Sequence, residues 1–311
     1  MRAVVIRTFG GPEVLQIADV PMPLAGEGQV RIRVEAATVN PVDLATRSGA
    51  LTEAGLLPVR DLIGIGWDVA GTVDQTGPGG TGLRRGDRVI GLSDRLDVPL
   101  GAQADYVVLD ADAVAAAPAG VSAVQAATLP LNGLTAAQAL DGLDLEHGQT
   151  LLVTGAAGAV GGFAVQLAVA RGLRVIAVAG ANDEPLVRRL GAELFVPRTA
   201  RLGEAVRRLV PGGAHAALDA AVVGVSALDA VRSGGAFAAL VAGGAPLPLR
   251  GIRVFHHWIR ADGARLSGLA ALVEAGSLTL RVAESRPLDQ VADAHRRLAA
   301  GGLRGRLVLT P

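Results

Sequence analysis

The segment from Thr150 to Asp183 constrains the fold most, because it reads as a strand, a glycine turn, a helix and a second strand in succession. In a dinucleotide-binding turn, small residues allow a tight bend, close approach of the pyrophosphate and close packing of helix on strand. Ala156, Gly158 and Gly161 have that spacing. The amides that open the helix can then bind the pyrophosphate. The segment predicts a nucleotide-binding βαβ unit.

A tight strand–helix turn without a ligand is the simpler alternative for this segment. Glycine spacing alone would not separate the two, but a strand directly before the turn and a helix directly after it favour the nucleotide. The residues of the turn expected to contact the cofactor are Ala156, Ala157, Gly158, Ala159, Val160 and Gly161.

Three stretches of different character divide the 311 residues, a length that favours more than one core. Residues 1–118 alternate short strand patterns with Gly and Pro turns, which predicts a mostly β domain. Residues 119–260 alternate apolar strands with amphipathic helices, as in a parallel sheet covered on both faces. Residues 261–311 carry two helix patterns and a closing strand. The predicted class is α/β, with a Rossmann doubly wound sheet in the second stretch.

Composition excludes several kinds of chemistry. The chain has no cysteine and no lysine, so thiolate catalysis, disulfides, a Schiff base and a Tyr/Lys pair are not available. The formal net charge is zero, which gives no electrostatic footprint for nucleic acid or an anionic membrane. Neither a secretion signal nor a run long enough to span a membrane is visible. We therefore expect a cytoplasmic protein with a small-molecule substrate.

Several further motifs carry a family resemblance. They include "AATVNPVDLATRSG" (36–49), "GIGWDVAGTV" (64–73), "AATLPLNGLTAAQAL" (126–140) and the final "AHRRLAAGGLRGRLVL". Together with "AAGAVG" in the turn, they resemble the zinc-independent quinone oxidoreductases and enoyl reductases of the medium-chain dehydrogenase/reductase superfamily. The resemblance implies a GroES-like catalytic domain (1–118), an inserted Rossmann domain (119–260), and a C-terminal return to the first domain (261–311). It also implies a nicotinamide cofactor in the cleft between them.

The segments that bind zinc in zinc-dependent relatives differ here. Those relatives place a Cys ligand in the segment matching "TVNPVD" and Gly-His-Glu in the one matching "GWDVAG", whereas this chain has Asn40 in the first and Trp67 and Asp68 in the second. A tetrahedral zinc needs three or four converging N, S or O ligands. We therefore predict no metal.

The choice between NADPH and NADH depends on the end of the second strand. An acid there usually binds the ribose of NAD, whereas a 2′-phosphate calls for Arg or other donors. The strand ends at Gly180 without an acid, which favours NADPH, with Asn182 nearby and Asp183 unfavourable to a phosphate. Arg198 follows the next strand and could bind the phosphate, or be a solvated surface residue. NADPH is preferred, and NADH remains the alternative.

Two residues are candidates for the chemistry. Asn40 lies in a Val-Asn-Pro turn matching the segment that faces the nicotinamide in relatives, and its amide could donate to a substrate carbonyl; a turn-stabilising Asn is the alternative. Thr135 matches a Thr beside the nicotinamide ribose, with a helix N-cap as the alternative. Asp43 and Arg47, four residues apart, are expected to form an ion pair.

Three residues are expected to line the substrate pocket. Trp67 replaces the zinc ligand and would form a wall, and Asn132 is unusual for the family. Leu51 stands where relatives often carry a Tyr, so a proton donor cannot be assigned there. Without another candidate donor, water is expected to deliver the proton that follows the hydride.

The sequence thus predicts a metal-independent NAD(P)H-dependent reductase that transfers hydride to a quinone or to the β-carbon of an α,β-unsaturated ketone. The alternatives are a protein that binds or senses NADPH without catalysis, and a ketone reductase. A homodimer is expected, because relatives pair their Rossmann sheets edge to edge; segments 236–243 and 251–259 are candidate edges. Residues 255–258 belong either to such an edge or to a cleft wall.

Overall fold

The computed structural model describes residues 1–80, 82–241 and 243–311, and the chain forms two compact units. Unit 1 comprises Met1–Leu131, Arg260–Ala275 and Leu280–Pro311, and unit 2 comprises Asn132–Ile259 and Gly276–Thr279. The division follows Leu131, whereas the sequence suggested a boundary after residue 118. The intervening segment belongs with unit 1 because its helix α3 (Ala123–Ala126) contacts strands of that unit.

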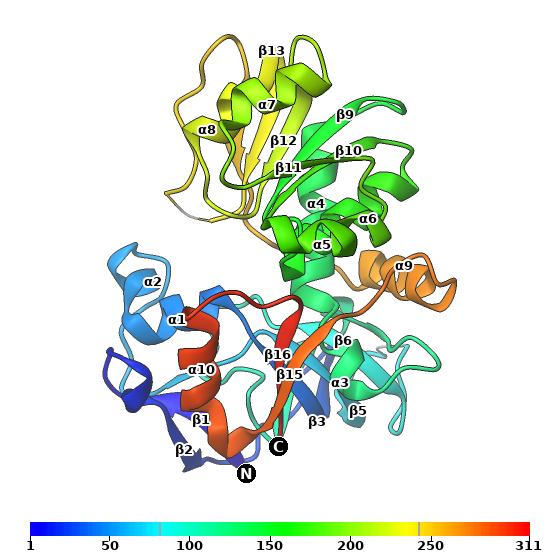
Figure 1. The fold of residues 1–311 in the computed structure, drawn as a ribbon. Coiled ribbons are helices and arrows are strands. Elements are labelled where there is room, and N and C mark those ends of the chain that lie inside the picture. Colours follow the sequence, from blue (N-terminus) through cyan, green and yellow to red (C-terminus); the bar gives the residue numbers. More distant parts are fainter. Residues whose placement is uncertain (81, 242) are drawn as a thin grey trace. The chain divides into compact units, whose positions relative to one another are not determined.

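Unit 1 is built on two sheets (Figure 1). The larger has the strand order β15-β16-β3-β5-β6-β8, with β7 also paired to β3, and the smaller has the order β2-β1-β4. The strands are β1 (Arg2–Ile6), β2 (Gln16–Asp19), β3 (Gln29–Val39), β4 (Ile63–Gly64), β5 (Asp68–Thr76), β6 (Arg88–Leu92), β7 (Tyr106–Asp110), β8 (Val114–Ala116), β15 (Val282–Pro287) and β16 (Arg306–Thr310). The remaining helical elements are η1 (Pro12–Val14), α1 (Pro41–Ser48), α2 (Ala50–Glu53), η2 (Ala111–Ala113), α9 (Gly263–Glu274), η4 (Leu288–Gln290) and α10 (Val291–Ala299).

Strand β3 shows how the sequence forms this sheet. Val30, Ile32 and Val34 alternate with the more exposed Arg31 and Arg33, as expected for a strand with one face on a core. The C-terminal strand β16 pairs antiparallel with β3, and Val308 lies opposite Thr38. Strand β15, which the sequence did not indicate, pairs in parallel with β16. The last residues of the chain therefore complete the sheet whose strand β3 leads to Asn40.

Unit 2 is a six-stranded parallel sheet with helices packed against it (Figure 1). The strand order is β11-β10-β9-β12-β13-β14. The strands are β9 (Thr150–Thr154), β10 (Arg174–Ala179), β11 (Leu194–Pro197), β12 (Ala214–Asp219), β13 (Val231–Ala239) and β14 (Arg253–His256). The helical elements are α5 (Ala159–Ala170), η3 (Ala181–Asp183), α6 (Glu184–Arg189), α7 (Leu202–Leu209) and α8 (Val225–Asp229), and α4 (Pro130–Leu143) continues into this unit from unit 1.

The burial of β9 explains why its sequence lacks alternation. All five of its residues are buried, which requires cover on both faces of the sheet. The order also contains a reversal: the chain runs from β9 outward to β10 and β11, and then returns to place β12 on the other side of β9. The predicted α/β class, with a GroES-like domain and a Rossmann sheet, is confirmed. No helix in the described part of the chain is long and apolar enough to cross a membrane.

Candidate functional site

The turn after β9 has the geometry of a dinucleotide-binding turn. Gly155 makes the bend with a φ of +59°, in the region that favours glycine. Ala156, at the first of the three small positions, is not among the residues with positive φ, and its amide donates to the carbonyl of Val178 at 3.1 Å. The residue that adopts positive φ is therefore Gly155, one residue before the first small position of the motif. This explains why alanine is accepted at 156. Helix α5 begins directly after Gly158, which makes no side-chain capping bond.

The two glycines of the turn have different tasks. A Cβ at Gly161 would lie 2.2 Å from the carbonyl oxygen of Gly155, so this position sets how closely the helix packs on the turn. A Cβ at Gly158 would meet the same oxygen only at 3.1 Å. That contact is tight but can be relieved by a shift of a few tenths of an ångström, so packing restricts Gly158 less than Gly161. These residues fit a pyrophosphate at the start of α5.

This difference predicts separate outcomes for two alanine substitutions. Gly161→Ala should lower the free energy of unfolding by about 1–3 kcal/mol through overpacking. Gly158→Ala should change unfolding much less, but weaken both NADPH and NADH by about tenfold or more, because its methyl group obstructs the pyrophosphate. Thermal unfolding and fluorescence titration of each cofactor measure the two effects. Equal cofactor affinity for Gly158→Ala and the wild type would contradict the assignment.

The structure brings the candidates for the adenosine end together. Gly180 follows β10, and Arg198 follows β11, the neighbouring strand. The backbone amide of Arg198 donates to the carbonyl of Ala179 at 2.8 Å. The side chains of Arg198 and Asn182 are exposed, whereas Asp183 is buried. Arg198 therefore originates beside Gly180, at the strand end where a 2′-phosphate would lie.

A buried carboxylate that the sequence analysis missed lies at the end of β12. Asp219 is 1% exposed and accepts hydrogen bonds from the Thr154 hydroxyl (2.5 Å) and from the amides of Val223 (3.1 Å) and Gly224 (2.7 Å). It therefore ties the loop after β12 to the last residue of β9. An acid at the end of a mostly apolar strand was the only signal in the sequence.

In unit 1, Asn40 lies at the end of β3 and is fully buried. Its Nδ2 donates to Oγ1 of Thr38 (2.9 Å) and to Oδ2 of Asp68 (2.6 Å), and its backbone amide donates to Oδ2 of Asp43 (2.7 Å). Both side-chain N–H groups are thus in use, and Oδ1 is a buried acceptor with no hydrogen-bond partner. The predicted donation to a substrate oxygen therefore requires Asn40 to release one of these bonds. The bond to the neutral Thr38 is the weaker of the two.

Two carboxylates complete this cluster. Asp43 also accepts from the amide of Gly66 (3.1 Å), and Asp68 accepts from the amide of Leu131 (2.6 Å) and from the hydroxyl of Thr38. Burial raises the pKa of Asp43 to about 7 and also raises the pKa of Asp68, while the nearby charge of Arg306 opposes both shifts. We define the buried acid cluster as Thr38, Asn40, Asp43, Asp68 and Arg306.

The expected ion pair between Asp43 and Arg47 is not what the structure shows. Asp43 uses both oxygens to accept backbone amides, whereas Arg47 donates to the carbonyl of Gly10 (3.1 Å) and contacts Nδ1 of His295 (3.3 Å). The prediction was wrong because spacing of four residues gives neighbours on a helix only when both side chains turn to the same side. Here Asp43 caps the start of α1 instead.

One of the three predicted pocket residues lines a hollow within unit 1. Trp67 lines a hollow of unit 1 with Leu57, Ile63, Leu96, Leu100 and Ser93 among its neighbours. Leu51 is buried in the adjacent hydrophobic core, and Asn132 is buried in α4 of unit 2. Thr135 also lies inside α4 and is 8% exposed, so its alternative as an N-cap is wrong.

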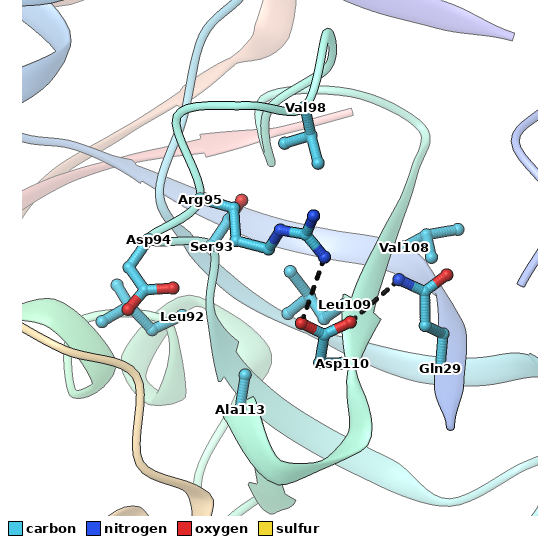
Figure 2. Close-up of a pocket in the computed structure, with 10 residues that line it drawn as sticks. All are labelled: Gln29, Leu92, Ser93, Asp94, Arg95, Val98, Val108, Leu109, Asp110 and Ala113. Atoms are coloured by element: carbon cyan, nitrogen blue, oxygen red, sulfur yellow. Dashed lines mark hydrogen bonds and ion pairs between the residues drawn. The ribbon is translucent and has the colours of Figure 1, made fainter. Parts of the chain in front are cut away.

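A second hollow of unit 1 is polar (Figure 2). Arg95 and Gln29 both donate to Asp110, at 3.3 and 2.8 Å, and Arg95 is also paired with Asp97. Gln29, Arg95 and Asp110 are thus joined to one another by hydrogen bonds. We assign no ligand to it.

Three features bear on other expectations. Tyr106 begins β7 and lies beneath the guanidinium of Arg31, 5.6 Å from the ring centroid, which is a structural contact. In the described part of the chain, no three His, Asp or Glu side chains converge in a way that could hold a metal ion.

Strand β14, with Phe255 and His256, is the last strand in the sheet order, whereas β13, which contains 236–239, lies inside the sheet. Of the two candidate edges, only the second is at the edge.

The fold and the turn define a two-unit protein with a GroES-like unit and a dinucleotide-binding sheet. Family models match in both parts: "Alcohol dehydrogenase GroES-like domain" at residues 26–119 and "Zinc-binding dehydrogenase" at residues 190–309. The chain belongs to the medium-chain dehydrogenase/reductase superfamily, among its quinone and alkenal/one oxidoreductases. The predicted family is confirmed.

Individual relatives are similar over the whole chain. The human quinone oxidoreductase is 30% identical, over 99% of this chain and 97% of its own length. The chloroplastic NADPH-dependent alkenal/one oxidoreductase of Arabidopsis thaliana is 31% identical, over 100% of this chain and 80% of its own. Among solved structures, an NAD-dependent alcohol dehydrogenase has a TM-score of 0.90 at 32% identity, and a mycobacterial protein complexed with NADPH has 0.85 at 30%; each match covers 100% of both chains.

Proposed function

We propose that this protein is an NADPH-dependent reductase that transfers hydride to a quinone or to the β-carbon of an α,β-unsaturated ketone. The observation that carries the proposal is the turn at Gly155–Gly161, at the carboxyl end of β9 where the strand order reverses. In an open α/β sheet, dinucleotides bind at such a reversal. The bound nicotinamide would supply the hydride, and the protein would supply binding, orientation and stabilisation of the oxyanion.

The donor set of unit 1 supports a reaction without metal. Asp68 lies in the segment matched to a zinc-binding segment of relatives, and its oxygens accept from Leu131, Thr38 and Asn40. The neighbouring Trp67 is buried and has no metal-binding atom. With Arg306 close enough to affect the pKa of Asp68, the local positive charge comes from the protein itself.

Oxidation of NADPH in the presence of a panel of quinones and enones tests the proposal. After dialysis against a chelator, the protein should still oxidise NADPH with at least one member of the panel. In D₂O, an enone should gain deuterium at the α-carbon, and hydride from labelled NADPH should appear at the β-carbon. Binding without turnover would favour a sensing protein, and reduction of simple ketones alone would favour a ketone reductase. Loss of activity on chelation that zinc restores would contradict the metal-independent reaction.

We propose, from the family resemblance, that Asn40 and Thr135 lie at the nicotinamide end of the cofactor, where the reaction takes place. Asn40 would donate to the developing oxyanion after releasing Thr38, at a cost of about 1 kcal/mol for one neutral hydrogen bond. Water would deliver the proton, because Tyr106 is engaged with Arg31. Trp67, Asn132 and Leu51 remain our proposed pocket residues, of which Trp67 is supported by the hollow that it lines.

The cofactor preference can be tested at Arg198. If its guanidinium binds the 2′-phosphate, Arg198→Ala should weaken NADPH by about 1.5–3 kcal/mol, the scale of a charge-assisted hydrogen bond, and leave NADH almost unchanged. Arg201→Ala is a matched control, because Arg201 is also exposed and lies three residues further along the chain. Titration of each variant with both cofactors measures the difference. An equal change in affinity for NADPH and NADH would indicate that Arg198 is a solvated surface residue that does not bind the phosphate.

We also propose a cytoplasmic homodimer. The support is the position of β14 at the end of the strand order, since a strand at a sheet edge offers backbone groups for pairing with a second copy. Light scattering at micromolar concentration tests this, and a monomer would count against it.

A further inference from the structure

The carboxamide of Asn40 is held in the orientation opposite to the one that the proposed reaction needs. Its Nδ2 donates to Asp68 and to Thr38, so both N–H groups are directed at the same pair of side chains. Its Oδ1 forms the other edge and has no hydrogen-bond partner in the described part of the chain. The amide of Asp43, which faces Asn40 in the capping box of α1, donates to the Asn40 backbone carbonyl at 3.0 Å. The edge left for a substrate therefore carries an acceptor, which would repel an oxyanion.

The charge of Asp68 fixes this orientation. An ionised carboxylate can only accept hydrogen bonds. Asp68 is fully buried; its Oδ1 accepts from the amide of Leu131 at 2.6 Å, and its Oδ2 accepts from Asn40 and from the hydroxyl of Thr38. If the carboxamide turned round, Oδ1 of Asn40 would face the carboxylate, and the two acceptors would repel each other. An ionised Asp68 therefore keeps Nδ2 of Asn40 turned away from a substrate.

A proton on Asp68 reverses this preference. Because Oδ1 of Asp68 is occupied by the Leu131 amide, the proton belongs on Oδ2, which becomes a donor toward Asn40. A half-turn of the Asn40 carboxamide then brings its Oδ1 to that donor and its Nδ2 to the opposite edge. The half-turn exchanges two atoms of nearly equal size and so keeps the shape of the side chain. The Thr38 hydroxyl can donate or accept, so it can stay bonded in both orientations.

Two charged side chains face Asp68. Asp43 approaches from α1 and Arg306 from β16, whereas the contacts from β3 and α4 are with uncharged groups. Burial raises the pKa of Asp68, and its hydrogen bonds and the charge of Arg306 oppose that shift. Beyond them, burial and the charge of Arg306 lower the pKa of Arg281. With two buried carboxylates beside the charge of Arg306, the buried acid cluster favours retaining a proton.

We propose that Asp68 is a positioning residue whose protonation turns the Asn40 carboxamide, so that Nδ2 reaches the substrate oxygen only while Asp68 carries a proton. That proton comes from solvent, stays on Oδ2 of Asp68 during the reaction, and is not the one that reaches the α-carbon of an enone. The inference rests on the proposed reductase function, with Asn40 as its oxyanion donor. It differs from the release of Thr38 alone, which needs no proton and leaves Oδ1 of Asn40 in place.

The pH dependence of single-turnover NADPH oxidation tests this role. In the wild type, the rate should fall about tenfold per pH unit above the apparent pKa of Asp68, because the ionised form holds Nδ2 of Asn40. Asp68→Asn is permanently neutral and offers an oxygen to the Leu131 amide and an N–H to Oδ1 of Asn40, so its rate should not fall over that range. In Asn40→Ala, which is slow at every pH, adding Asp68→Asn should leave the pH profile unchanged.

Nuclear magnetic resonance reports the half-turn directly. The chain has three asparagines, Asn40, Asn132 and Asn182, so isotope-labelled asparagine gives three side-chain amide signals. The signal that is lost in Asn40→Ala belongs to Asn40. In the wild type it should shift with pH at the same midpoint as the rate, and in Asp68→Asn it should stay constant.

Three results would overturn the inference. One is a wild-type rate that does not fall with rising pH, and another is an Asn40 signal that stays constant while the rate falls. The third is an Asp68→Asn protein that folds, binds NADPH and keeps the wild-type pH profile. If the wild type oxidises NADPH with no quinone or enone, the proposed function fails instead, and the Asn40 signal alone decides whether Asp68 turns the carboxamide.

Discussion

Arg306→Met should destabilise the folded protein by about 3–5 kcal/mol, the scale expected when buried charges lose a compensating opposite charge. Arg306 is 5% exposed, and its charge lowers the pKa of Asp43 and Asp68, both fully buried. Without it, the two carboxylates would remain in the interior among the hydrogen-bond donors already described. Chemical denaturation at pH 8 measures the loss. Arg85→Met is the control, since Arg85 is 82% exposed and should change stability little.

The same substitution should have a pH-dependent effect. Burial raises the pKa of Asp43 to about 7 in the folded protein, above its unfolded value, so the folded state binds a proton more tightly than the unfolded state. Proton binding by Asp43 therefore stabilises the folded state at low pH, and this stabilisation is lost as pH rises toward and through 7. Removing Arg306 raises the folded pKa further, so the destabilisation should be larger at pH 8 than at pH 5. A loss that is constant over this range would contradict the buried acid cluster as its cause.

Asn40→Ala should lower kcat by about 10²–10³, the usual cost of losing one donor to an oxyanion, with a smaller effect on KM. Thr38→Val is the matched control, because it removes the neutral partner of Asn40 and leaves the Asn40 carboxamide in place. If Asn40 acts on the substrate, Thr38→Val should retain most of the turnover. Tyr106→Phe should also remain active.

Steady-state kinetics on each variant, with thermal unfolding alongside, distinguish a chemical role from a structural one. If Asn40→Ala turns over normally, or if Thr38→Val loses as much kcat as Asn40→Ala, Asn40 is a structural residue of the buried acid cluster. Asn40 would then resemble Asp43, which acts through the backbone amides of its neighbours.

Local patterns in the sequence predicted the βαβ unit at residues 150–179 well. The turn, its strands and its helix are adjacent in the chain, so spacing alone places Gly158 at the start of α5. The proximity of Arg198 to Gly180 was also within reach, because neighbouring parallel strands end at the same edge of a sheet. Even here, the sequence did not show that Gly155 makes the bend in place of residue 156.

Contacts between distant segments were not predictable in the same way. Arg306 reads as an ordinary charged residue at the start of a closing strand, and only the pairing of β16 with β3 brings it near Asp43 and Asp68. Asp219 and Thr154 are 65 residues apart and meet because β12 returns to the side of β9. Periodicity carries information about faces of elements, but not about which strands become neighbours.

The pairing of β16 with β3 also fixes an order of events during synthesis on the ribosome. Most of unit 2 is one continuous segment, Asn132–Ile259, so its sheet can form as soon as that segment has left the exit tunnel. The sheet of unit 1 must wait, because Leu307 to Leu309 pair with residues 37–39 and are translated after the whole of that segment. Until then, one edge of β3 in the nascent chain is exposed, and the carboxylates beside Asn40 have no Arg306. The sheet of unit 2 can therefore form first, and the sheet of unit 1 is completed only after residues 306–310 have been synthesised.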